Sequence, residues 1–327
     1  MLPKVSVVLL TYNGSKFVKS CLQYIMHIDY PKNRMEVIVV DNNSTDNTID
    51  IVKNFKNVRI IQLDKNYGFA YGNNRGAAAA KGEYIAFISQ DAQVTRNWLI
   101  ELVKAIYDKP YIGAACSVSL YFDNKKRINS AGGFWSILGI SGSIGDIPYT
   151  EGNIPKYAFF PSGVSLIMKK SVFKKIGGFD ADYFLYVEDT DLGWRIWDAG
   201  YKVVVCPTSI LYHKKEMYGT RSPKYYFFNT KNRLFTIAKD ATSFVMLPML
   251  VSSILVHLVQ MSIFIVKGKP YHAWETLNGI LWFFGNLNLI GRKRQLWKYR
   301  TGKALQMMFG LGDSINIMSK KTSKHFR

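Results

Sequence analysis

Short apolar runs alternate with segments of helical spacing along residues 5–88, and this alternation constrains the fold more than any other feature of the sequence. The runs at 5–10 and 36–40 enclose the segment 15–28, whose apolar residues recur at the spacing of a helix, as in a βαβ unit. The pattern continues with a helix at 47–54, a strand at 58–63, a helix at 72–80 and a strand at 84–88. The sequence therefore predicts an α/β fold, with a mostly parallel sheet flanked by helices on both faces.

Polar residues follow the predicted strands at the points where the strands end. They are Thr11 and Asn13, then Asp41, then Gln90 and Asp91. Ligands of open α/β sheets bind at the carboxyl ends of the strands, so we predict a binding site that uses these side chains.

Asp41 opens the sequence DNNSTDNT, directly after a predicted strand. A carboxylate at that place can accept hydrogen bonds from a ribose or a base. The alternative is a helix cap, but Ser44 and Asp46 suffice to cap the helix that follows. We therefore predict ligand contact for Asp41.

The segment 66–76, NYGFAYGNNRG, is rich in glycine and amide side chains and leads into a predicted helix. A helix N-terminus favours phosphate, because its backbone N–H groups point at the anion. Asn66, Asn73 and Arg75 are therefore candidates for contact with a nucleotide diphosphate. The alternative is that the glycines serve tight packing or positive φ angles.

Asp91 and His213 are candidate metal ligands. Asp91 follows an apolar strand and can offer a hard oxygen ligand to a divalent cation that bridges two phosphates. His213 precedes Lys214 and Lys215, so an imidazole ligand and cationic phosphate contacts can come from one loop. The alternatives are a turn-forming Asp before the next helix and an inert surface histidine.

Glu188 and Asp189 stand at the start of a predicted helix, whose dipole favours ionised acids at that end. A general base that deprotonates an alcohol must be a charged and positioned carboxylate, and either residue meets this requirement. Capping of the helix by Asp189 or Asp191 is the alternative.

The stretch 131–152 is rich in Gly, Ser and Ile and has no helical period. We predict a mobile loop or lid of the site there. A strand at 164–169 and a helix at 170–176 follow, and Gly177 and Gly178 end that helix.

The stretch 241–266 contains no acid or base apart from His257. At about 1.5 Å per residue, a helix of this length can span about 30 Å of hydrocarbon. A second apolar patch, 279–290, is too short to span. If 241–266 alone crossed the membrane, the basic tail would lie opposite the rest of the chain, against the positive-inside tendency, so we predict a hairpin or an in-plane arrangement. The alternative is a helix buried against the domain or in a homodimer interface.

The formal net charge of +20 implies an anionic partner, which is a nucleic acid, a nucleotide phosphate or an acidic membrane surface. The basic tail at 267–327 has Glu275 and Asp313 as its acids and follows an apolar stretch, so it favours a membrane and not a nucleic acid. The three cysteines are far apart and form neither a disulfide framework nor a zinc motif, which fits a domain that faces the reducing cytoplasm.

The ordered set of segments resembles the family 2 glycosyltransferases with the GT-A (Rossmann-like) fold, particularly the rhamnosyltransferase-like branch. The segments are VSVVLLTYNG, VIVVDNNSTDNT, NYGFAYGNNRG, YIAFISQDA, GGFDADYFLYVEDTDLGWR and the late His213, and together they cover about residues 4–237. The resemblance implies an inverting hexosyl- or deoxyhexosyltransferase. Its donor would be a UDP-, dTDP- or GDP-sugar and its acceptor a hydroxyl of a lipid-linked or cell-surface glycan.

The resemblance also assigns roles to residues. Asp189 matches the family's base, with Glu188 beside it as an acceptor contact, while Asp91 and His213 match the metal-ligating positions. The contacts with the nucleotide sugar that it implies are Thr11, Asn13, Asp41, Asn73 and Arg75, and we predict the same role for Asn66, Gln90 and Asp91.

One departure concerns the metal. Ser89 and Gln90 precede Asp91 where many members of the family have a further acid. A Mg²⁺ or Mn²⁺ ion held by the diphosphate, Asp91, His213 and water is compatible with this, because magnesium uses few protein carboxylates. The alternative is a metal-independent variant that uses Lys214, Lys215 or Arg221.

The predicted organisation is a catalytic domain at 1–240 that faces the cytoplasm and a membrane-associating helical region at 241–327. A catalytically silent scaffold that binds a nucleotide sugar is the alternative function.

Overall fold

A mixed β-sheet forms the core of the protein. Its strands are β1 (Val5–Thr11), β2 (Met35–Asp41), β3 (Val58–Gln62), β4 (Tyr84–Ser89), β5 (Ala92–Val94), β6 (Ile112–Tyr121), β7 (Ile128–Ser130), β10 (Ser165–Lys169) and β11 (Lys202–His213). The computed structural model describes residues 1–214 and 222–308. The strand order is β3-β2-β1-β4-β10-β6-β11-β5, and β7 pairs with β6. β1 to β4 pair in parallel, whereas β10 runs antiparallel between β4 and β6.

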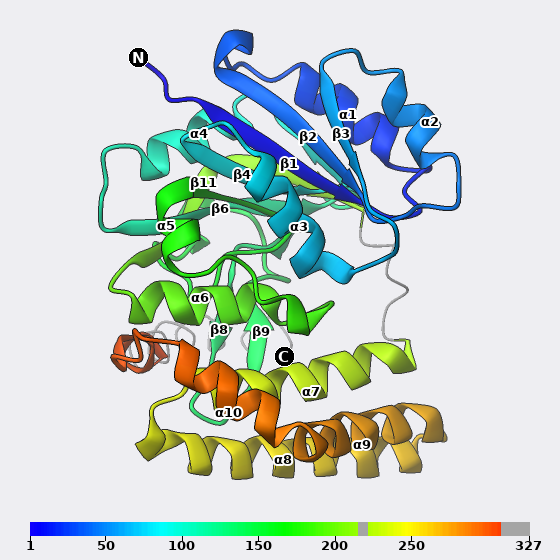
Figure 1. Ribbon diagram of the computed structural model, residues 1–327, viewed down its shortest axis with the longest axis vertical. Helices are drawn as coiled ribbons and strands as arrows, with labels where there is room; N and C mark the ends of the chain where they lie inside the picture. The colour runs from blue at the N-terminus through cyan, green and yellow to red at the C-terminus, as the bar shows by residue number, and fades with distance from the viewer. Residues whose placement is uncertain (215–221, 309–327) are drawn as a thin grey trace.

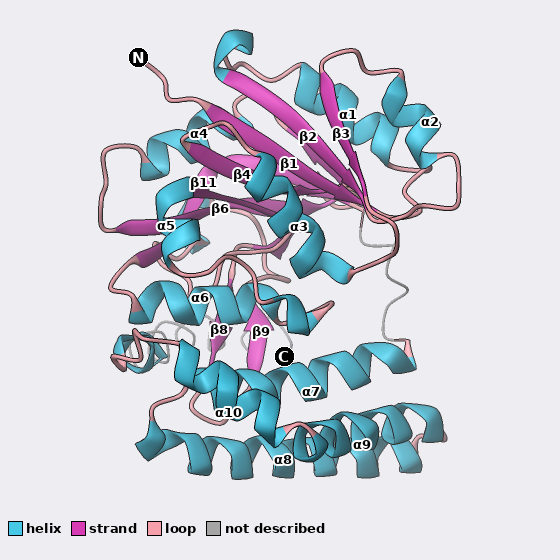
Figure 2. Cartoon of the chain, viewed as in Figure 1, coloured by secondary structure: helices cyan, strands magenta, loops and turns pink. Residues whose placement is uncertain are grey.

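Helices cover both faces of this sheet, as Figure 2 shows. One face carries α1 (Val18–Met26), α2 (Thr48–Lys53) and α4 (Trp98–Ile106), and the other carries α3 (Gly68–Ala79), α5 (Lys170–Lys175) and α6 (Glu188–Asp198). In β1, Val7 and Leu9 join one apolar cluster, Val8 joins the other, and all three are fully buried. A strand covered on both faces is apolar at successive positions, and this is the pattern that predicted the α/β fold. The prediction is confirmed.

The predicted loop at 131–152 contains a β-hairpin of β8 (Gly133–Trp135) and β9 (Ser141–Ser143). Trp135 is buried and packs edge-on against Trp194 of α6, with ring centroids 5.6 Å apart. The hairpin is therefore anchored in the core. Single helical turns lie at η1 (Lys32–Arg34), η2 (Glu151–Asn153) and η3 (Ala181–Tyr183).

Four helices form a further layer below α6 in Figure 1. They are α7 (Pro223–Asp240), α8 (Ser243–Val266), α9 (Pro270–Gly285) and α10 (Leu287–Leu296). α7 and α9 approach closely, since a Cβ atom on Gly279 would lie 2.8 Å from the Cβ of Thr230 and 2.9 Å from the carbonyl oxygen of Phe227. α8 and α9 form a helical hairpin that lies on the far side of α7 from the sheet (Figure 1).

α8 carries the apolar stretch predicted at 241–266. Among the described residues, it is the helix long and apolar enough to cross a membrane, yet only 17% of its most apolar window is buried. Its inner side buries Met249, Ser253 and His257. Most of its apolar surface faces outward, so the alternative of a helix buried within the domain does not describe α8.

Candidate active site

The carboxyl ends of β1 and β4 meet through Thr11 and Gln90, both of which are buried. The Thr11 hydroxyl donates a hydrogen bond to Oε1 of Gln90. Oε1 also accepts the backbone N–H of Tyr12 at 3.2 Å, and Nε2 donates to the carbonyl oxygen of Tyr12 at 3.2 Å. Gln90 thus joins the two strand ends at the predicted site.

Asn13 and Asp41 lie on either side of one turn. The backbone N–H of Asn13 donates to the Ser44 hydroxyl at 2.9 Å, and its Oδ1 accepts the N–H of Thr45 at 2.8 Å. Asp41 accepts hydrogen bonds from the backbone N–H, at 3.1 Å, and the hydroxyl of the same Ser44. The carboxylate that was predicted for ligand contact therefore also holds the turn in shape.

Asn66 is brought to the end of β2 by a residue that sequence reasoning missed. Nδ2 of Asn42 donates to Oδ1 of Asn66 at 2.8 Å and to the carbonyl oxygen of Gly68 at 3.1 Å. Oδ1 of Asn42 accepts the N–H of Tyr67 at 2.9 Å. Asn42 lies among several turn-forming residues in DNNSTDNT, and nothing in that run marks it out.

The structure gives less direct support to the predicted roles of Asn73 and Arg75. Asn73 is buried and donates from Nδ2 to the carbonyl oxygen of Phe69 in its own helix at 3.0 Å, while Arg75 is exposed. The close packing proposed as the alternative for the glycines of 66–76 is present, since a Cβ on Gly72 would lie 2.3 Å from Leu10. Contact between either residue and a diphosphate stays a prediction.

Asp91 and His213 lie side by side, although 122 positions separate them in the sequence. β11 pairs antiparallel with β5, which sets His213 opposite Ala92. Nε2 of His213 is 3.1 Å from Oδ2 of Asp91, and Nδ1 is 3.1 Å from Oδ1 of Asn129. Since an amide oxygen only accepts, Nδ1 donates the hydrogen bond to Asn129, and Nε2 faces the Asp91 carboxylate.

This pair fits a cation. Oδ2 of Asp91 is buried and lies 3.1 Å from Nε2 of His213, so the two atoms are close enough together to bind one ion. A carboxylate oxygen and an imidazole held by its other nitrogen are common metal ligands. Within residues 1–214 and 222–308, no group of three or more His, Cys, Asp or Glu side chains could hold a metal, so two protein ligands are what this pair offers.

Glu188 and Asp189 begin α6, as predicted. Oδ2 of Asp189 accepts the backbone N–H of Gly163 at 3.2 Å, and Oδ1 accepts the Thr190 hydroxyl at 3.3 Å. Val164 follows Gly163, and its carbonyl oxygen accepts the N–H of Ser89 at 2.9 Å. Asp189 is thereby linked through this segment to the end of β4. The predicted base and the predicted metal ligands thus meet around one strand end.

Burial raises the pKa of both acids, Asp189 and Glu188. It raises the pKa of Asp189 to about 6. Burial, together with the nearby charge of Asp189, raises the pKa of Glu188 well above its ordinary value, and Oε2 of Glu188 has no hydrogen-bond partner. At neutral pH Asp189 is therefore mostly ionised, and the pKa of Glu188 is shifted in the direction that favours its protonated form.

The loop before α6 has an unusual backbone. Phe184, Tyr186 and Val187 have φ angles of 62°, 68° and 70°, in the region that residues with side chains seldom adopt. Each such residue costs about 1–3 kcal/mol, and strain of this kind gathers at functional sites. Sequence reasoning missed it, because no glycine marks these positions.

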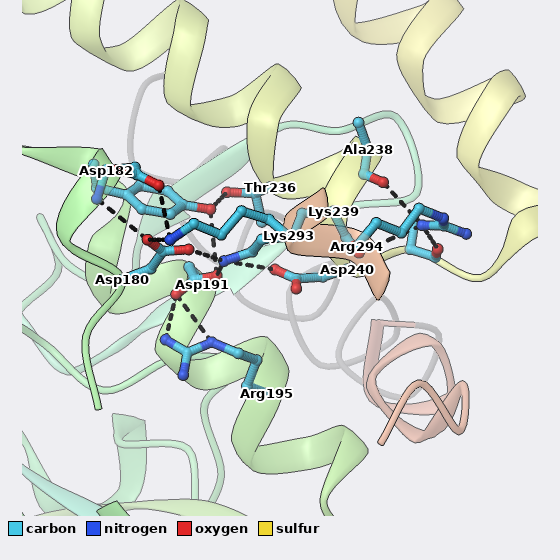
Figure 3. Close-up of polar contacts among 12 residues, drawn as sticks. Asp180, Asp182, Asp191, Arg195, Thr236, Ala238, Lys239, Asp240, Lys293 and Arg294 are labelled. Carbon is cyan, nitrogen blue, oxygen red and sulfur yellow. Dashed lines mark hydrogen bonds and ion pairs between the residues drawn. The ribbon is translucent and has the colours of Figure 1, made fainter. Parts of the chain in front are cut away.

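Asp191 belongs to a buried cluster of charges between α6 and the helical layer (Figure 3). It accepts hydrogen bonds from Arg195 and from Lys239 of α7. Lys239 also pairs with Asp180 at 3.0 Å, and Lys293 of α10 pairs with Asp180 at 2.8 Å. Although burial acts to raise it, Arg195 and Lys239 hold the pKa of Asp191 below its ordinary value. Asp191 thus anchors α6 to α7, and the capping role considered for it is not observed.

Two family models match the chain. One, described as glycosyl transferase family 2, matches residues 6–177, which is more than half of the sequence. The chain belongs to glycosyl transferase family 2. The other model, the N-terminal domain of galactosyltransferase, matches residues 147–218 of this family 2 enzyme.

Sequence relatives confirm that the protein is a glycosyltransferase, and a rhamnosyltransferase is among them. It is 26% identical over 233 residues to the O-antigen chain rhamnosyltransferase RfbN of Salmonella typhimurium, and the match covers 69% of this chain and 71% of that protein. It is 26% identical over 209 residues to the poly-beta-1,6-N-acetyl-D-glucosamine synthase of Staphylococcus epidermidis, where 63% of this chain and 48% of that protein are covered. The chain thus spans about half the length of the second relative.

Solved structures confirm the GT-A fold of this glycosyltransferase. Residues 1–349 of TarS from S. aureus, in complex with UDP-GlcNAc, superpose with a TM-score of 0.60 at 19% identity, covering 96% of this chain and 91% of that one. The mannosyltransferase PcManGT from Pyrobaculum calidifontis, in complex with GDP-Man and Mn²⁺, gives 0.58 at 20% identity, with coverages of 94% and 87%. At these identities the likeness concerns the fold.

Proposed function

We propose that the enzyme is an inverting hexosyl- or deoxyhexosyltransferase that moves a sugar from a nucleoside-diphosphate sugar to an acceptor hydroxyl. Asp189 carries the proposal, as a carboxylate with a pKa of about 6 beside the end of β4. At neutral pH it is ionised and basic enough to take the hydroxyl proton while the oxygen attacks the anomeric carbon. The nucleoside diphosphate leaves from the opposite face, so one base is enough. Glu188, next to Asp189 at the start of α6, would contact the acceptor.

The donor would bind across the ends of β1 and β2. Asn13 and Asp41 share one turn there, and Asn42 holds Asn66 beside it. The related structures that contain UDP-GlcNAc and GDP-Man support a UDP-, dTDP- or GDP-sugar as the donor class.

A Mg²⁺ or Mn²⁺ ion would be held by Oδ2 of Asp91 and Nε2 of His213, and diphosphate oxygens and water would complete its shell. When bound, such an ion neutralises charge on the leaving diphosphate. The metal-independent alternative would use cationic side chains such as Lys214, whose Nζ lies 4.4 Å from the centre of the Phe122 ring. Lys215 and Arg221 lie outside the described residues.

Thermal unfolding of the full chain with UDP-, dTDP- and GDP-sugars tests the donor and the metal together, because a ligand that binds the folded state raises its stability. We expect one nucleotide class to raise the melting temperature, with a further increase in Mn²⁺. Asp91→Asn should lose the increase due to Mn²⁺, while Asp50→Asn, on an exposed part of α2, should keep it. A rise in melting temperature without sugar transfer to any acceptor would favour the catalytically silent scaffold. An unchanged melting temperature with every nucleotide sugar would contradict the proposed donor site.

We also propose that the enzyme works at a membrane, where a lipid-linked acceptor would be found. α8 and α9 expose many large apolar side chains, which are those of Phe244, Leu247, Val251, Leu255, Leu258, Val259, Ile263, Tyr271, Trp274, Leu281 and Phe284. Exposed Lys267 and Lys269 stand at the corner between the two helices and suit anionic lipid head groups. Because Met249, Ser253 and His257 on the inner side of α8 are buried against the protein, the arrangement favours a helix pair in the membrane plane.

The double variant Leu247→Glu with Leu255→Glu tests this face by flotation with phosphatidylglycerol-containing vesicles. Each leucine withdrawn from lipid costs about 1.5–3 kcal/mol, so we expect membrane affinity to fall by at least about 100-fold. Tyr111→Glu, at an exposed aromatic residue outside the helical layer, should bind like the wild type. If the wild type ignores vesicles and forms a dimer that the double variant breaks, the face is a homodimer interface instead.

The predicted division at residue 240 is kept as part of this proposal, with 1–240 as the catalytic domain on the cytoplasmic side and 241–327 as the membrane-associating region. Cys21, Cys116 and Cys206 are all buried and unpaired, which suits a reducing compartment.

A further inference from the structure

Asn232, in the middle of α7, is fully buried and directs its amide at the loop that leads into α6. Its Nδ2 group donates hydrogen bonds to three backbone carbonyl oxygens, those of Tyr183 at 3.0 Å, Leu185 at 2.9 Å and Tyr186 at 2.7 Å. Three carbonyls that converge on one point repel one another unless a donor stands between them. One side chain of the helical layer therefore stabilises the shape of this loop.

The backbone of the loop explains the need for such a donor. Phe184, with φ 62° and ψ −62°, is the centre of a γ-turn in which the N–H of Leu185 donates to the carbonyl oxygen of Tyr183 at 2.7 Å. Tyr186 and Val187 then follow with positive φ, and Glu188 begins α6. A backbone of this kind persists only where its surroundings over-determine it.

The opposite side of the loop rests on the start of α3. The carbonyl oxygen of Phe184 accepts the N–H of Phe69 at 2.6 Å. A Cβ atom on Gly68 would lie 2.2 Å from that same oxygen, so position 68 has to be glycine. The loop is thus held between α7 and the segment that begins with Asn66, a residue for which we predict contact with the nucleotide sugar.

We propose that Asn232 is a positioning residue, which fixes the place of the Asp189 carboxylate by holding the loop 183–187 in its left-handed shape. The inference rests on the proposed role of Asp189 as the base. Asp189 follows the loop by two residues, so any relaxation at Tyr186 or Val187 moves the start of α6. A displacement of about 1 Å in a catalytic group can reduce the rate about 100-fold.

The chemistry at position 232 is specific to an amide. An Asp there would set carboxylate oxygens against carbonyl oxygens, and an Ala would leave buried carbonyls without a donor. Asn229, one turn earlier on α7, provides a matched control, because its Nδ2 contacts the Tyr225 hydroxyl at 3.4 Å and not this loop.

The test compares Asn232→Ala, Asn232→Asp and Asn229→Ala in the full chain, by hydrogen exchange and by steady-state kinetics. We expect both variants of Asn232 to speed amide exchange over residues 184–190 by at least about tenfold, with the strands of the sheet unchanged. Their kcat should fall by about 100-fold while the KM for the donor stays within about twofold, since the base and not the donor pocket has moved. Asn229→Ala should match the wild type in both measurements.

The two readouts separate this inference from the proposed function. If the wild type transfers no sugar, the proposed function fails, and exchange at 184–190 still reports whether Asn232 holds the loop. Unchanged exchange in Asn232→Asp would overturn the inference, and so would a kcat that matches the wild type. If Asn232→Ala unfolds throughout, Asn232→Asp, which has nearly the same shape, decides the outcome.

Discussion

Asp189→Asn is expected to reduce kcat by about 10²–10⁴-fold, which is the usual contribution of a general base. The change keeps the size of the side chain and removes its ability to take a proton. Donor binding, measured by thermal shift, should stay close to that of the wild type, because the carboxylate acts on the acceptor. The fold should not suffer, since a carboxylate whose pKa is raised on folding destabilises the folded state when it ionises.

Glu188→Gln is the matched comparison for this prediction. Burial raises the pKa of Glu188 and so favours its neutral form, which Gln matches closely in shape. We expect a loss of no more than about tenfold, from a weakened acceptor contact. Abolished transfer in Glu188→Gln with transfer retained in Asp189→Asn would reverse the assignment of the base.

The pH profile gives the same prediction a second readout. A base works only when ionised, so kcat should rise with pH through about 6 and level off above it. Asp189→Asn should lose this acid limb from its residual activity. A wild-type profile that is flat between about pH 5 and 8 would mean that no group with this pKa limits transfer.

The strand-end rule explains why much of the site could be predicted from the sequence. Thr11 and Asp41 end recognisable buried strands and Asp91 follows another, and parallel strands of one sheet end at a shared edge. The contact between Asp91 and His213 was inferred from family resemblance, since it depends on β11 reaching β5 across the sheet. A run of five residues such as β10 does not reveal its direction, which is why the antiparallel strands of the sheet were not predicted.

The positioning of the base could not be predicted, because its signals are absent from the residue types. Phe184, Tyr186 and Val187 adopt positive φ angles, although such angles are normally predicted from glycine or asparagine. Asn73 and Asn74 are identical and adjacent, yet Asn73 bonds within α3 while Asn74 exchanges hydrogen bonds with the backbone of Phe179, at 2.7 and 3.0 Å. Which face of a helix meets which loop is decided by tertiary packing.

Lys239→Met is expected to lower the free energy of unfolding by about 3–5 kcal/mol, the range for breaking a buried ion pair by removing one partner. Lys239 is buried, and its ammonium group contacts Asp191 and Asp180 (Figure 3). Methionine fills nearly the same space, so the loss reports the charge and not the packing. Chemical denaturation of the full chain measures the change.

Lys53→Met provides the control for this comparison. Lys53 pairs with Asp50 at 3.6 Å on the surface, where the two side chains are 62% and 79% exposed, so its loss should change stability by less than about 0.5 kcal/mol. The two variants differ because Asp191 is buried and Asp50 is not. Without Lys239, Asp191 stays inside the protein with Arg195 as its ion-pair partner, whereas Asp50 is exposed to water when Lys53 is removed. If Lys239→Met were as stable as Lys53→Met, the cluster would not fasten α6 to α7. The base-bearing helix would then owe its position to apolar packing and to Asn232.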